Sequence, residues 1–105
     1  MSANPHQGEH SFTVDGVTYT LALNWRSLGR AERLADKPVG WLMQNLHWLS
    51  TLSALFFAGL ERHHPSMTQD DVDALLAKVK ADEALKIISE ALKAAFPQED
   101  KPASP

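Results

Sequence analysis

Apolar and polar residues alternate in the two short segments that flank Asp15-Gly16. This dipeptide supplies the two positive-φ positions of a type I′ turn, so the pattern predicts a β-hairpin. One hairpin face carries the apolar side chains, which are Phe12, Val14, Val17, Tyr19 and Leu21. A two-stranded hairpin is only marginally stable alone, so we expect helices to cover this face.

A helical period follows the hairpin, with Asn24 as its expected cap. The inward face of this helix is expected to hold Trp25, Leu28, Glu32 and Ala35. Glu32 is expected either to lie at the rim of this face or to be a partly buried acid that needs a partner, such as a neighbouring arginine or a backbone amide. The opposite face is a basic stripe of Arg26, Arg30, Arg33 and Lys37. We interpret the stripe as a solvated face, which an acidic protein partner would also suit.

Three further helices are expected to start along the chain, with Ser50, Thr68 and Asp82 as their caps. A very apolar stretch runs from Val39 to Leu49, and Ser50 is the expected cap of the next helix. That helix has an apolar stripe of Leu52, Leu55, Phe56, Gly59 and Leu60, in which the glycine is expected to allow close packing. It is expected to end in the polar run before Pro65.

The clearest start signal is Thr68, with Asp71 in the capping-box position and Met67 and Val72 as a hydrophobic staple. After a break near Ala81, Asp82 is expected to cap a last helix. Its inward residues are expected to be Leu85, Ile88, Leu92 and Phe96. The predicted fold is therefore α+β and mainly helical, with an N-terminal β-hairpin packed on four to five short helices.

The predicted domain covers residues 10–96. Residues 1–9 hold little that could be buried, and residues 97–105 carry three of the six prolines among charged residues, so we expect a disordered arm and a disordered tail there. The chain has 105 residues, which fits one small domain. Its formal charge is -3, so no basic excess favours nucleic acid. It has no cysteine, which removes disulfides and thiolate chemistry.

Catalytic and metal-binding patterns do not emerge from the sequence. The adjacent His63 and His64 cannot share one helix face, and we interpret them as part of a surface turn. Asp70, Asp71 and Asp73 lack the glycine and closing glutamate of a calcium loop, and acids are favoured in a first helical turn anyway. We therefore expect no enzyme activity, no cofactor and no metal.

Residues 38–60 contain no Asp, Glu, Lys or Arg. The stretch is long enough to cross a bilayer, but polar residues crowd its centre, so a membrane span is disfavoured. The alternatives are that both helices are core or that part of the stretch is a contact surface, because a small domain leaves large apolar groups near its outside. We predict an aromatic groove for a protein partner, formed by Trp41, Leu42, Trp48, Phe56 and Phe57.

The order of these parts resembles the tail assembly chaperone family of gene transfer agents and related long-tailed phages, over roughly residues 10–96. The positions that carry the resemblance are Asp15, Gly16, Leu28, Glu32, Leu55, Ala58, Gly59, Leu60, Thr68 and Val72. Trp41 and Trp48 depart from it, since lighter aliphatic residues are expected there. The resemblance implies a non-catalytic, cytoplasmic factor of the bacterial host cell that binds the tape measure protein and helps tail tube protein to polymerise.

Two other functions stay open beside this one. The chain would also suit a structural tail or head–tail joining component that is retained in the particle, or a membrane-associated helper that uses residues 38–60. We expect neither nucleic acid nor a membrane as a partner, and the sequence leaves a homo-oligomer open.

Overall fold

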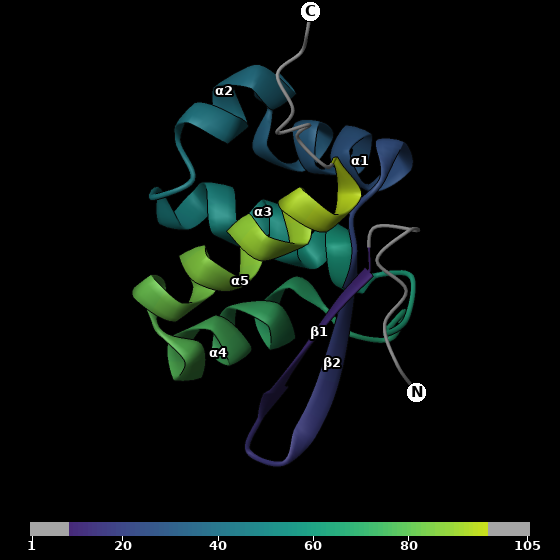
Figure 1. Cartoon of the computed structure of the whole chain (residues 1–105), viewed down its shortest axis with the longest axis vertical. Helices are drawn as coiled ribbons and strands as arrows, with labels where there is room; N and C mark the ends of the chain where they lie inside the picture. Colours follow the sequence, from purple (N-terminus) through teal and green to yellow (C-terminus); the bar gives the residue numbers. More distant parts are fainter. Residues whose placement is uncertain (1–8, 97–105) are drawn as a thin grey trace, which may run out of the picture.

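The computed structural model describes residues 9–96, in which an antiparallel hairpin precedes five helices (Figure 1). The strands are β1 (Glu9–Val14) and β2 (Val17–Ala22). The helices are α1 (Trp25–Ala35), α2 (Val39–Gln44), α3 (Leu49–Leu60), α4 (Gln69–Val79) and α5 (Ala81–Ala95). The expected fold class, α+β and mainly helical, is confirmed. The predicted disorder of residues 1–8 and 97–105 lies outside the described residues.

The hairpin has the expected turn. Asp15 and Gly16 have φ values of 52° and 78°, and Val14 pairs with Val17 across the turn. Phe12 lies opposite Tyr19 in this register, and their rings stack with centroids 5.6 Å apart. The first strand begins at Glu9, one residue before the expected domain boundary, since Glu9 is paired with Ala22.

Helix α3 is the central element of the core. It contacts α1, α4, α5 and β2, and its expected apolar stripe is entirely buried. A methyl group at Gly59 would lie 2.8 Å from Cδ2 of Leu21 and 3.1 Å from Cδ2 of Leu23. The glycine therefore allows α3 to pack directly on the end of the hairpin, as expected.

Two predicted helix caps are confirmed and two are wrong. The Asn24 and Thr68 side chains each accept a backbone N–H in a reciprocal capping box, with Ser27 and Asp71 respectively. Helix α3 instead begins before Ser50, with Trp48 at the cap position. Lys80, at φ 76°, precedes α5, so Asp82 lies in the first turn. There its charge favours the positive end of the helix without capping it.

The buried face of α5 is rotated from the predicted one. Its buried residues are Ala84, Ile87, Ile88 and Ala91, whereas Leu85 and Leu92 are half-buried. Phe96, expected inward, is 37% exposed. Helix α5 packs against α3, α4 and the hairpin, and the small side chains of Ala84 and Ala91 on its buried face suit a close approach.

The uncharged stretch forms two separate helices, α2 and α3, joined by a turn at residues 45–48. Over the described part of the chain, no helix combines the length and apolarity that crossing a bilayer requires.

Candidate partner-binding surface

The three tryptophans occupy three different environments. Trp25, the first residue of α1, is 83% exposed, although we expected it to face inward. Trp48, before α3, is 50% exposed, and Leu49 next to it is 70% exposed. Trp41 on α2 is half-buried and meets the Trp48 ring edge-on, with centroids 5.5 Å apart. Exposed tryptophan surface is therefore available at two places, the start of α1 and the start of α3.

The predicted aromatic groove is wrong for two of its five residues. Leu42 and Phe56 are 0% exposed, so neither can contact a partner while the domain is folded. Phe56 packs edge-on against Phe12 of the hairpin, with ring centroids 5.8 Å apart. Phe56 is therefore a core residue that covers the apolar face of the hairpin.

Phe57, the next residue, lies half-buried below Arg30. The Cζ atom of Arg30 is 5.8 Å from the centre of the Phe57 ring, at a distance typical of a cation–π contact. The same guanidinium donates two hydrogen bonds to Glu61, at 3.2 Å and 3.1 Å. Arg30 is thus bound within the domain, and Phe57 is partly covered by it.

The basic stripe divides between two locations. Lys37 places its Nζ 5.2 Å from the centre of the Trp41 ring, over α2. Arg26 and Arg33 are exposed and line a depression between α1 and the end of α3, together with Arg30 and with Arg62. Arg62 was missed in the sequence because it lies after α3, far along the chain from the stripe.

Glu32 has the backbone partner that its position on α1 required. Its Oε2 accepts the N–H of Val39, the first residue of α2, at 2.6 Å. Pro38 occupies the cap position of α2 and offers no side-chain hydrogen bond, so Glu32 fulfils that role from the preceding helix. The prediction of a backbone amide partner is confirmed, and the interaction is structural.

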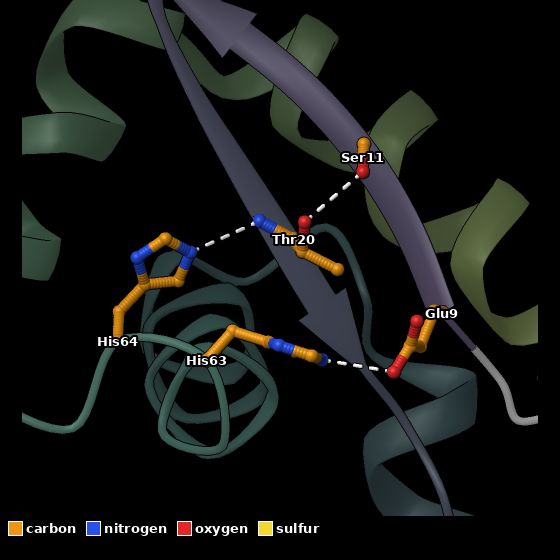
Figure 2. Close-up of polar contacts among 5 residues, drawn as sticks. All are labelled: Glu9, Ser11, Thr20, His63 and His64. Carbon is orange, nitrogen blue, oxygen red and sulfur yellow. Dashed lines mark hydrogen bonds and ion pairs between the residues drawn. The ribbon is translucent and has the colours of Figure 1, made fainter. Parts of the chain in front are cut away.

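His63 and His64 connect the turn after α3 to the hairpin (Figure 2). His63 Nε2 lies 2.8 Å from Oε2 of Glu9, and His64 Nε2 accepts the N–H of Thr20 at 3.1 Å. Burial lowers the pKa of His64 from its ordinary value of 6.5, and the neighbouring His63 lowers it further. These contacts were missed because their partners lie more than forty residues earlier in the chain.

The remaining polar clusters have structural partners. Asp70 and Asp71 lie in the first turn of α4, as expected, and Asp73 accepts a hydrogen bond from Ser53 at 2.7 Å. Among residues 9–96, no group of three or more His, Asp or Glu side chains is arranged to hold a metal ion.

The chain was compared with protein-family models, curated proteins and solved structures, and none of them matches it.

Proposed function

We propose that the protein is a non-catalytic tail assembly chaperone of a phage or gene transfer agent. In the cytoplasm of the bacterial host it binds the tape measure protein and assists the tail tube protein to polymerise around it. The observation that carries the proposal is the exposure of Trp25 and Trp48, at 83% and 50%. Tryptophan is enriched among residues that dominate binding energy, and such groups are costly to leave in water.

The positions of these side chains support binding to an extended or helical partner. Trp48 and Leu49 lie at the junction of α2 and α3, and Trp25 lies at the junction of the hairpin and α1. We propose that one long partner contacts both junctions, because two weak contacts on one chain reinforce each other. Within the described residues, five of the polar side chains singled out in the sequence serve in caps or in links between elements: Glu32, His63, His64, Asp71 and Asp73.

Copurification tests the proposal. The full chain is coexpressed with a tagged tape measure protein from the same genome, and both are recovered with and without the double substitution Trp25→Ser and Trp48→Ser. Retention of the wild-type chain and loss of the double variant is the expected result. Val17→Ser is the matched control, because Val17 is also 50% exposed but lies at the hairpin turn, at the opposite end of the molecule from α1 and α2 (Figure 1).

Mass spectrometry of purified particles separates this function from a structural one. A chaperone leaves the assembled tail and is absent from the particles. A stoichiometric presence of the chain would identify it instead as a tail or head–tail joining component.

A further inference from the structure

Four arginines meet in one surface depression, here called the arginine depression. It has a volume of about 720 Å³, and its basic lining comes from Arg26, Arg30 and Arg33 of α1 and Arg62 after α3. Its other lining residues are mostly small or polar, including Ala22, Ser27 and Ala58. Ala22, Ser27 and Ala58 are buried, and their small side chains leave the depression open between α1 and the end of α3.

Positive charge in the depression exceeds what the fold neutralises. Glu61 is the one acid in its lining, and it is already bound by Arg30 through two hydrogen bonds. Within residues 9–96, no carboxylate forms an ion pair with Arg26, Arg33 or Arg62. Three guanidinium groups are therefore available to carboxylates from outside the domain.

Trp25 joins the arginine depression to an apolar one. Its side chain lines the arginine depression and also a neighbouring groove, here called the Trp25 groove. The Trp25 groove is lined by Trp25, Leu28, Val39, Met43, Leu92, Lys93 and Phe96. A ligand that covers both surfaces must carry an apolar stripe beside a run of acidic groups.

We propose that these two surfaces together bind an acidic amphipathic helix of a partner protein. The apolar face of that helix lies in the Trp25 groove, and its flanking Asp or Glu side chains pair with Arg26, Arg33 and Arg62. Arginine suits this role because its planar guanidinium binds a carboxylate through two parallel hydrogen bonds. The Trp25 groove favours such a helix over nucleic acid, because a nucleic acid bound to the arginines would leave the apolar groove empty.

This inference deepens the proposed function and rests on it only for the identity of the natural partner. The test therefore uses synthetic peptides. One fluorescein-labelled peptide of about 18 residues, or five helical turns, carries leucines at i, i+3, i+4 and i+7 with glutamates beside them. A second peptide has the same leucines with lysines in place of the glutamates.

Fluorescence anisotropy with the full chain measures both affinities at about 50 mM and about 300 mM salt. We expect the glutamate peptide to bind at least about tenfold more tightly than the lysine peptide, and to weaken as salt rises. The double substitution Arg26→Glu and Arg33→Glu is expected to weaken binding of the glutamate peptide at least about tenfold. The matched charge control, Lys78→Glu with Lys86→Glu, is expected to change it less than about twofold.

Circular dichroism confirms that each variant is folded before its affinity is measured. Failure of the glutamate peptide to bind, equal binding of the two peptides, or unchanged binding by the Arg26 and Arg33 variant would overturn the inference. Tighter binding to a DNA duplex or to phosphatidylglycerol vesicles than to the glutamate peptide would overturn it as well. If the glutamate peptide binds as expected but the tape measure protein does not, the arginine site stands and the proposed function fails.

Discussion

The N–H of Thr20 donates a hydrogen bond to Nε2 of His64, at 3.1 Å. Alternate N–H groups of an antiparallel strand point away from its partner, and the histidine satisfies one of these on β2. The Tyr19 ring lies beside the imidazole, with centroids 5.4 Å apart. Since Nε2 accepts this hydrogen bond, the ring must be neutral with its proton on Nδ1, and protonation breaks this one hydrogen bond between the hairpin and the turn.

The stability of the fold is predicted to depend on the pH through His64. Its folded pKa lies below the ordinary 6.5, so its contribution is complete above pH 6.5. As pH falls below this value, the unfolded chain takes up the proton first, and the free energy of unfolding decreases until the folded pKa is reached. Urea unfolding between about pH 8 and about pH 5 measures this decrease.

His64→Gln provides the comparison, because its amide oxygen still accepts a hydrogen bond but does not titrate. As the pH falls below 6.5, the free energy of unfolding of the variant is expected to decrease less than that of the wild type. The histidines away from position 64 are common to both proteins and cancel in the difference, whereas the influence of His63 on the pKa of His64 is part of the difference that is measured. Identical pH dependence in the two proteins would show that His64 does not contribute.

Gly59→Ala is expected to destabilise the domain by about 1–2 kcal/mol. The added methyl group would lie 2.8 Å from Leu21 Cδ2 and 3.1 Å from Leu23 Cδ2, so both of these buried side chains must shift within the core. Overpacking costs about 1–3 kcal/mol, which exceeds the gain of up to about 1 kcal/mol in helix propensity.

Gly29→Ala is the matched control in α1. A methyl group there has no atom within 4 Å, so only the propensity gain remains and the domain is expected to become up to about 1 kcal/mol more stable. Thermal or urea unfolding measures both variants. The same sign of change at the two glycines would contradict the close packing of α3 on β2.

Glu32→Ala is expected to cost about 1–2 kcal/mol and to loosen α2, because the Val39 N–H loses its 2.6 Å hydrogen bond. Glu32→Gln keeps an acceptor at the same position and is expected to retain most of the stability. Amide hydrogen exchange at Val39 reports on the bond directly. Equal protection of that amide in the wild type and in both variants would rule out the proposed cap.

Thr51→Val is expected to stabilise the domain by about 1 kcal/mol, because a buried hydroxyl without a partner is removed. Thr51 is 1% exposed, and its Oγ1 has no hydrogen-bond partner among residues 9–96. Thr51→Ser keeps the hydroxyl but removes the methyl group, so it is expected to be less stable than the wild type. Chemical denaturation of the three proteins tests this order, which the reverse ranking of Val and Ser would contradict.

The features predicted well from the sequence are those that neighbouring residues determine. The Asp15-Gly16 turn and the Thr68 cap depend on local backbone geometry, and both have the expected form. Burial within α3 depends instead on tertiary packing. Four elements surround that helix, and its buried positions extend beyond one helical stripe. No local pattern could then separate the buried Phe56 from the exposed Trp48.

The candidate site was predicted less well for a related reason. Trp25 has a helical position that suits an inward face, but it is the first residue of α1 and is 83% exposed, whereas Leu28 one turn later is buried. Arg62 joins Arg26 and Arg33 only through the packing of α3 on α1. Both placements result from the tertiary arrangement of the helices, which the periodicity of one helix cannot predict.

The central claim is that exposed tryptophan surface binds another polypeptide. Its most direct test is calorimetric titration of the full chain with helical fragments of the tape measure protein. The double variant Trp25→Ser and Trp48→Ser, folded by circular dichroism, is predicted to bind at least about tenfold more weakly than the wild type and than Val17→Ser. Equal affinity of all three proteins for those fragments would contradict the account.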